Sequence, residues 1–560
     1  MGEKIRFFAL GGLDENGKNM YIVEVDDDIF VIEAGLKYPD STRPGIDFII
    51  PNIDYLKNNK QRVRAYIISH GHDDQFGALP FIYDQVPAPI YGTEATLMML
   101  VRFTKKAGLK REYNLNVIEP SSTVKIANRN FVFFQTTHNA MFSVGVAIDT
   151  SQGYVVYSSD FIVEYNPSNR YKLELNEIAK IAEKNVLCLL AESMGAERPG
   201  YTSPSHRITP HIDGVIRDAK GRVFISLYDQ SPYSVEELVA VAKKHNRKIM
   251  LYNESADEYF QMFKEHNLPL CEPNMLISPD DLFRVNENTL IILLLNNGED
   301  LFDDINDLAL KRNKDKRFVL SEHDNFIIAC PAPATLEIQA TETLDNLYIS
   351  GTQVHNVSRK LVSNMHAQEE DLRMFLALLK PKYYIPIKGN FRHQEANANV
   401  ALKAGLNYNH TNIFLLDNGI PVVFENGKGK TLFKDEDRII SGDLMVDGTG
   451  IGDTNRGVLE DRLNFSSDGV IVLGLIFSMQ KRKIVAGPDV QMRGFVYLRD
   501  SESLLKQVIK IFVETVEKNL LEPEIDMQKI SDEVKDKVER YIYHDTRRNP
   551  VIIPLIRPLD

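Results

Sequence analysis

The sequence predicts an α/β protein of several domains. Short apolar runs alternate with amphipathic segments over most of the chain, a pattern typical of strands that alternate with helices. The 560 residues suffice for roughly three or four domains with well-buried cores. A stretch rich in Gly and Asp at 441–458 separates the long N-terminal part from residues 459–560, and we expect a linker there.

Each part of the chain has its own pattern of elements. Residues 5–36 are expected to form strands on both sides of a Gly-rich turn. Three apolar strands within 205–350 alternate with helical stretches, which predicts a small parallel sheet. Beyond the linker, a strand near 470–477 precedes two helices with apolar stripes, and a last strand covers 551–556.

The composition is that of an ordinary globular protein. The net charge of −13 argues against a general nucleic-acid coat, although a local basic patch stays compatible with it. The three cysteines show neither a disulfide framework nor a zinc spacing, so we expect a cytoplasmic protein in a reducing compartment. No apolar run is long enough to span a membrane, and Met1 is not followed by a signal peptide.

The most informative stretch follows a short apolar run at 65–68, which we interpret as a buried strand. It continues into His70, His72 and Asp74. Alternate residues of an extended segment point to the same side, so two imidazoles and a carboxylate can converge on one point. This donor set suits zinc or manganese. The alternative is a polar loop that happens to hold two histidines.

Two later strands end in further candidate ligands. The predicted strand at 131–135 ends shortly before His138, and the one at 154–158 runs into Asp160. Taken singly, a His or Asp after a strand is usually a cap or a turn residue. Together with the two histidines of the first loop, they would complete one metal site. Asp160 would also face a second metal beside Asp74.

These motifs resemble the metallo-β-lactamase superfamily, whose signature is His-X-His-X-Asp-His. The final His of that signature is Gln75 here. Lys388 stands where a His ligand of the second metal is expected. The substrate-binding loop that the resemblance implies, in place of a His-Ala-Ser-Gly-His motif, consists of Val362, Ser363, Asn364, Met365 and His366.

The resemblance continues to the C-terminus. A Glu-Arg-Pro-Gly-Tyr turn at 197–201 looks like the start of the β-CASP insertion of nucleic-acid-processing relatives, and the last part is similar to the C-terminal domain of ribonuclease J. The chain is therefore identified as a member of the ribonuclease J family. The pattern of signature residues that it has lost resembles that of the second, catalytically weakened paralogue of Gram-positive bacteria.

This resemblance implies the fold and its division. The expected architecture is an αββα sandwich with an inserted β-CASP α/β domain and a small α+β C-terminal domain. The implied parts are the metallo-β-lactamase domain at 1–204 and 351–440, the β-CASP domain at 205–350, the linker at 441–458 and an oligomerisation domain at 459–560.

The family also implies an activity, a metal-dependent ribonuclease that acts on RNA from its 5′ end and internally, in mRNA decay and rRNA maturation. Asp74 would be catalytic, with His366 as proton donor and Glu192 orienting its neighbours. Because an ammonium at 388 competes with a dication for carboxylates, we expect at most one well-formed Zn²⁺ or Mn²⁺ site. Each lost ligand costs catalysis orders of magnitude, so intrinsic cleavage should be weak or absent.

Partners follow from the same resemblance. They are RNA, an active ribonuclease J paralogue and a second copy of the chain, the latter two through the C-terminal domain, with other RNA-decay proteins as further candidates. Two functions stay open, a weak ribonuclease that works with its paralogue and a non-catalytic, RNA-binding scaffold subunit. The insertion at 205–350 and the C-terminal domain disfavour a β-lactamase or a small-molecule thioesterase.

Overall fold

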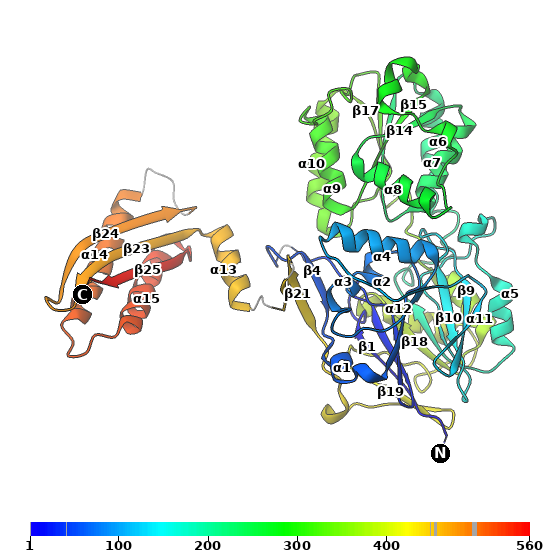
Figure 1. Ribbon diagram of the computed structural model, residues 1–560, viewed down its shortest axis with the longest axis horizontal. Helices are drawn as coiled ribbons and strands as arrows, with labels where there is room; N and C mark the ends of the chain where they lie inside the picture. The colour runs from blue at the N-terminus through cyan, green and yellow to red at the C-terminus, as the bar shows by residue number, and fades with distance from the viewer. Residues whose placement is uncertain (1, 41, 449, 453–455, 495–500, 560) are drawn as a thin grey trace. The chain divides into compact units, whose positions relative to one another are not determined.

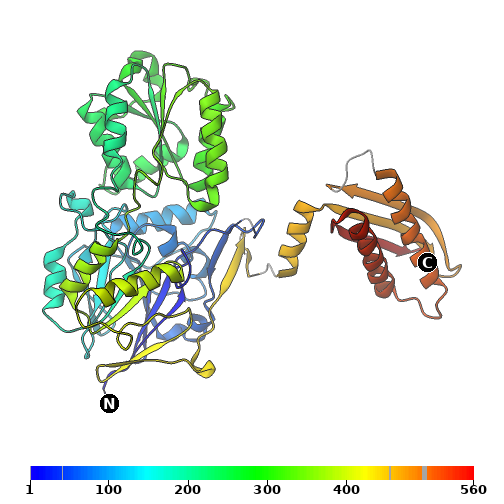
Figure 2. The ribbon, with the colours of Figure 1, turned by 180° about the vertical axis from the view of Figure 1, so that it is seen from behind.

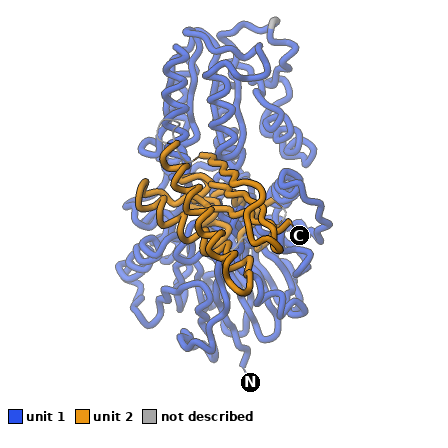
Figure 3. The backbone as a smooth tube through the Cα atoms, turned by 90° about the vertical axis from the view of Figure 1, so that its left-hand side faces the viewer, with its two compact units in different colours: residues 1–38, 48–444 blue, residues 39–47, 445–560 orange. Residues whose placement is uncertain are grey.

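The computed structural model describes the chain except for residues 1, 41, 449, 453–455, 495–500 and 560. The chain divides into two compact units, residues 1–38 with 48–444 and residues 39–47 with 445–560 (Figure 3). The predicted linker at 441–458 contains β21 (Asp443–Asp447), β22 (Gly450–Ile451) and the start of α13 (Arg456–Ser467). Its positions 449 and 453–455 lie outside the described residues.

Two facing sheets form the centre of the first unit, as predicted for a sandwich (Figure 1). The first has the order β20-β19-β1-β2-β3-β5-β6-β7. Its strands are β1 (Ile5–Gly11), β2 (Met20–Val25), β3 (Asp28–Ile32), β5 (Val63–Ile67), β6 (Ile90–Gly92), β7 (Leu115–Val117), β19 (Val422–Glu425) and β20 (Lys428–Thr431).

The second sheet has the order β18-β12-β11-β10-β9-β8. Its strands are β8 (Thr123–Ile126), β9 (Arg129–Gln135), β10 (Val144–Ile148), β11 (Tyr154–Tyr157), β12 (Val186–Glu192) and β18 (Tyr383–Ile387). Apolar side chains of both sheets, such as Phe30 and Phe131, form one continuous core between them. Alternate residues of each strand contribute to this core, because successive side chains of a strand point to opposite faces of the sheet.

Helices cover the sandwich on both sides. α5 (Leu175–Ala182), α11 (Glu369–Leu379) and α12 (Phe391–Lys403) pack on the outer face of the second sheet, and α11 and α12 lie in front of it in Figure 2. The apolar residues of α11, among them Leu372, Phe375 and Leu376, are buried there. The other helices of the sandwich are α1 (Asp54–Asn58), α2 (Asp73–Phe76), α3 (Leu79–Ile82) and α4 (Glu94–Lys106), and a short strand, β4 (Phe48–Pro51), precedes α1.

An inserted domain interrupts the sandwich between β12 and β18. Its five strands are all parallel, as predicted, in the order β14-β15-β13-β16-β17. They are β13 (Val223–Tyr228), β14 (Lys248–Leu251), β15 (Leu290–Asn296), β16 (Asn325–Ile328) and β17 (Gln353–Asn356). The helices are α6 (Thr209–Asp218), α7 (Pro232–Lys244), α8 (Glu254–Glu265), α9 (Gly298–Ala309) and α10 (Glu337–Ile349).

The second unit is a small α+β domain. Its sheet has the order β24-β23-β25, formed by β23 (Val470–Ser478), β24 (Lys483–Arg493) and β25 (Val551–Pro558). The predicted apolar stripes of α14 (Ser501–Leu520) and α15 (Met527–Thr546) meet one face of this sheet. Val508 and Phe512 of α14 pack there with Val534 and Val538 of α15.

Candidate metal centre

The topology brings the candidate ligands to one edge of the sandwich. β11, β12 and β18 are parallel neighbours, so Asp160, Glu192 and Lys388 all lie at or just beyond the C-terminal ends of adjacent strands. β9 runs in the same direction, because both β9 and β11 are antiparallel to β10. His138 therefore reaches the same edge from a fourth strand.

The first histidine pair comes from the other sheet. β5 ends at Ile67, and α2 begins at Asp73, so His70 and His72 lie in the connecting turn. His70 Nε2 lies 3.1 Å from His72 Nδ1. Gly71 between them packs closely, because a Cβ there would lie only 3.0 Å from Cγ of Met99 on α4.

Four donor atoms converge at this point. His138 Nε2 lies 3.3 Å from His72 Nδ1. Asp160 Oδ2 lies 3.5 Å from His70 Nε2 and 3.7 Å from His138 Nε2. One donor atom from each of these four residues lies within 4.8 Å of the others. The structure thus brings together all four residues predicted for the first metal site.

The ring nitrogens that point away from the cluster fix the tautomers of His72 and His138 through their hydrogen bonds. His138 Nδ1 donates to the carbonyl of Met365 at 2.7 Å, and His72 Nε2 donates to that of Gln230 at 2.9 Å. A carbonyl oxygen can only accept, so in a neutral ring the other nitrogen carries a lone pair. Burial lowers the pKa of His70, and it lowers those of the other two histidines as well, which favours the neutral rings.

Two lone pairs therefore face each other across 3.3 Å, on His72 Nδ1 and His138 Nε2. They repel unless a cation lies between them or His70 Nε2, 3.1 Å from His72 Nδ1, donates a proton there. Oδ1 of Asp160 is buried and has no hydrogen-bond partner in the described part of the chain. Three imidazoles and one carboxylate are a ligand set that zinc accepts, so this cluster fits a divalent cation.

A lysine lies where a second cation would be expected. Lys388 Nζ lies 3.0 Å from Asp74 Oδ2 and also contacts Asp160 Oδ2. Its side chain is buried. Burial alone would lower the pKa of Lys388, but the carboxylates of Asp160 and Asp74 outweigh it and raise this pKa. The ammonium is therefore charged and pairs with both carboxylates.

The residue that replaces the signature histidine points to the same carboxylate. Nε2 of Gln75 donates to Asp74 Oδ2 at 3.3 Å, and Nδ2 of Asn19 donates to it at 3.1 Å. Gln75 is fully buried, and its Oε1 has no hydrogen-bond partner among the described residues. Asp74 is thus surrounded by an ammonium and two amides.

His366 and Glu192 form a pair beside the cluster. His366 Nδ1 lies 2.7 Å from Glu192 Oε2 and 3.8 Å from Asp160 Oδ2. Glu192 Oε1 accepts from the backbone N–H groups of Phe161 and Ala367, which fixes the carboxylate. Burial would lower the pKa of His366, but the two carboxylates outweigh it and raise this pKa. The pair therefore favours a protonated imidazole.

Comparison with known proteins identifies the family. The model of the metallo-beta-lactamase superfamily matches residues 13–167, and that of the ribonuclease J C-terminal domain matches residues 457–558. Proteins named Ribonuclease J 2 from Staphylococcus epidermidis and Staphylococcus aureus are each 32% identical over 552 residues, covering 99% of this chain and 98% of the relative. The chain belongs to the ribonuclease J family.

A solved structure shares the fold of this ribonuclease J family member. It is a protein of unknown function from Enterococcus faecalis, with a TM-score of 0.50 and 17% identity, and the match covers 77% of this chain and 100% of that one. Membership in the metallo-β-lactamase superfamily implies a divalent metal, and the four-residue cluster is the place that fits it. Within the described residues, no helix is long and apolar enough to cross a membrane.

In the predicted substrate loop of this ribonuclease J family member, main-chain groups form hydrogen bonds within the protein. The N–H of Ser363 donates to the carbonyl of Ser205 at 2.8 Å, and the carbonyl of Met365 accepts from His138. The N–H of His366 donates to the carbonyl of Asn364. Within the described structure, no hydrogen bond joins the side chains of Val362, Ser363 or Asn364 to the cluster. Of this loop, His366 brings its side chain to the centre.

Sequence analysis missed three residues that support the centre. Asn19 holds Asp74, Gln230 holds His72, and Tyr38 donates to Asp73 Oδ2 at 2.7 Å. Gln230 lies 158 residues from His72 in the chain, and no local pattern marks it. Asn19 directly precedes a strand after the Gly-rich turn, a place where a polar residue could have been suspected.

Proposed function

We propose that this chain is a ribonuclease J-type RNA hydrolase with one well-formed cation site and weak activity of its own. The facing lone pairs of His72 and His138 carry this proposal, together with the ammonium of Lys388 on the two remaining carboxylates. We further propose that residues 205–350 are a β-CASP insertion. The protein would act in the cytoplasm with an active paralogue that it binds through its C-terminal domain.

The first site would hold Zn²⁺ or Mn²⁺ through four residues, which are His70, His72, His138 and Asp160. A bound cation there would polarise a phosphate oxygen of RNA. Lys388 adds a fixed positive charge next to it. An ammonium offers no open coordination position, so it cannot lower the pKa of a water molecule as a second metal does. This difference supports weak rather than full activity.

His366 is the proposed proton donor to the leaving oxygen. Its Nδ1 lies against Glu192, so its Nε2 remains to present a proton to a substrate. Glu192 sets the ring orientation, because two backbone N–H groups and the imidazole hold its own carboxylate. These two residues would then cooperate with the cation on the phosphodiester.

A non-catalytic, RNA-binding subunit is the second candidate. The main chain of the 362–366 loop favours it, because three of its N–H groups, those of Val362, Ser363 and His366, already have partners within the protein. Backbone N–H groups that are already bonded cannot approach a phosphate.

An assay on single-stranded, 5′-monophosphorylated RNA separates the two candidates. The purified chain, His366→Ala and the control His410→Ala would be compared with Mn²⁺ or Zn²⁺, alone and mixed with the active paralogue. His410 lies on an exposed loop. Weak cleavage that His366→Ala abolishes and His410→Ala preserves supports the enzyme. Equal background cleavage by all three proteins supports the second candidate, the non-catalytic, RNA-binding subunit.

A further inference from the structure

We propose that the inserted domain sets the orientation of His72, with Asp229 and Gln230 as positioning residues of the cation site. This inference rests on the proposed function, in which His72 is a cation ligand. Both positioning residues directly follow β13, the central strand of the inserted sheet. They reach the centre from a different domain than the ligands do.

Gln230 holds the turn that carries the ligand by two separate bonds. Its carbonyl accepts from His72 Nε2 at 2.9 Å, and its side-chain Nε2 donates to Asp73 Oδ2 at 2.6 Å. The first bond decides which nitrogen of His72 faces the cluster, because the outer nitrogen must keep its proton. Such outer partners fix the tautomer and the ring orientation of metal-binding histidines.

Asp229 anchors this strand end to the sandwich. Arg102 Nη1 on α4 lies 2.7 Å from Asp229 Oδ2, and Lys106 Nζ lies 3.5 Å from it. The side chain of Asp229 is 2% exposed, and the Arg102 guanidinium lies over the ring of Tyr259. A buried ion pair of this kind is costly to break on one side, since the other charge stays buried without a partner.

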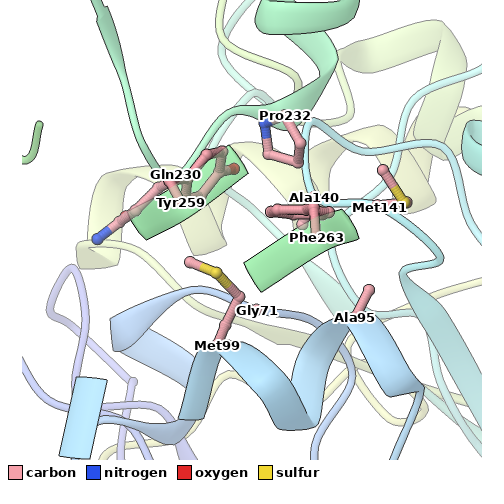
Figure 4. Close-up of a pocket in the computed structure, with 9 residues that line it drawn as sticks. All are labelled: Gly71, Ala95, Met99, Ala140, Met141, Gln230, Pro232, Tyr259 and Phe263. Atoms are coloured by element: carbon pink, nitrogen blue, oxygen red, sulfur yellow. The ribbon is translucent and has the colours of Figure 1, made fainter. Parts of the chain in front are cut away.

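An apolar contact lies next to this ion pair and includes the ring of Tyr259, over which the Arg102 guanidinium lies. Figure 4 shows Met99 of α4 below Tyr259 and Phe263 of α8, with Gly71 of the histidine turn beside them. The cavity that they line measures about 10 Å³, roughly the room of a single water molecule. The region is therefore a domain contact and not a ligand pocket. A movement of the inserted domain that breaks the Arg102–Asp229 pair also withdraws the carbonyl from His72.

Zinc affinity, measured by competition with a chromophoric chelator, tests this coupling in the full chain. We expect Asp229→Ala to bind zinc about tenfold more weakly, the usual cost of losing an outer partner, and Asp229→Asn to lose less. Because ring orientation changes the ligand field, the visible spectrum of the Co²⁺-loaded protein should also change. Glu258→Ala is the matched control, since Glu258 pairs with Lys105 of α4 at 3.5 Å across the same boundary but is exposed.

The outcomes separate this inference from the proposed function. If the unchanged chain binds no cation, the proposed function fails. If it binds zinc, but both Asp229 variants keep its affinity and Co²⁺ spectrum, the positioning role is overturned. An equal loss in Glu258→Ala overturns it as well, because the effect would then belong to the whole boundary. Should Asp229→Ala not fold, as judged by its metal-free unfolding transition, Asp229→Asn decides.

Discussion

The ammonium nitrogen of Lys388 lies 3.0 Å from Oδ2 of Asp74, in the position next to the histidine cluster. It also contacts Asp160, which lies within reach of His70 and His138. One side chain therefore joins the carboxylate of the four-residue cluster to that of Asp74, which we propose belongs to a degenerate second site. We propose that its positive charge takes the place of a second dication.

Removing this charge should destabilise the metal-free protein. In Lys388→Met, Asp74 and Asp160 face each other without a cation, so we expect the free energy of unfolding to fall by about 3–5 kcal/mol. Urea unfolding in the presence of a chelator measures it. The control Lys434→Met removes a lysine from an exposed pair with Glu436 and should cost less than about 1 kcal/mol. Equal stability of the two variants would contradict the role of Lys388.

Gly35 should be irreplaceable behind the centre. A Cβ at this position would lie 1.7 Å from the backbone oxygen of Asp74. Because this is a backbone atom, no side-chain rotation can relieve the clash. We expect Gly35→Ala to lose about 3 kcal/mol of stability, together with zinc binding. Gly214→Ala is the control, because Gly214 lies in α6, where an added Cβ meets only the end of the Arg217 side chain, at 4.0 Å. Alanine also favours a helix over glycine by about 1 kcal/mol. Unchanged zinc binding in Gly35→Ala would refute the tight contact.

His206 should make the first unit sensitive to acid. Burial lowers its pKa to about 4, although Glu164 at 3.4 Å opposes the shift and Arg207 adds to it, and the ring also contacts the Tyr233 hydroxyl. The unfolded chain has a pKa of about 6.5 there, so it binds the proton first as the pH falls. The free energy of unfolding therefore keeps its full value above pH 6.5. It falls by on the order of 3 kcal/mol as the pH drops from 6.5 to 4. Unfolding of the wild type and His206→Gln at several pH values checks it, and parallel curves would exclude this role.

The strands and most of the candidate ligands could be predicted because each depends on a local pattern. Apolar runs marked β5, β9 and β11, and His138 and Asp160 follow such runs by only a few residues. The role of Lys388 could be expected only by comparison with a family motif. Its contacts with Asp74 and Asp160 became visible only in the structure. Gln230 could not be predicted, since its partner is far away in the chain and a backbone carbonyl makes the contact.

Restoring the lost ligands should create a second cation site. In the double variant Gln75→His with Lys388→His, the ammonium is removed and two imidazoles return beside Asp74 and Asp160. We expect one additional Mn²⁺ or Zn²⁺ per chain by isothermal titration, with faster RNA hydrolysis. If a second cation binds without faster hydrolysis, the altered substrate loop at 362–366 limits the reaction.

The number of tightly bound divalent cations per wild-type chain tests the central claim most directly. Native mass spectrometry after equilibration with zinc, or with manganese, gives this number without reference to activity. The account predicts one cation per chain, lost in His138→Ala and kept in His410→Ala. Two tightly bound cations in the wild type would contradict it.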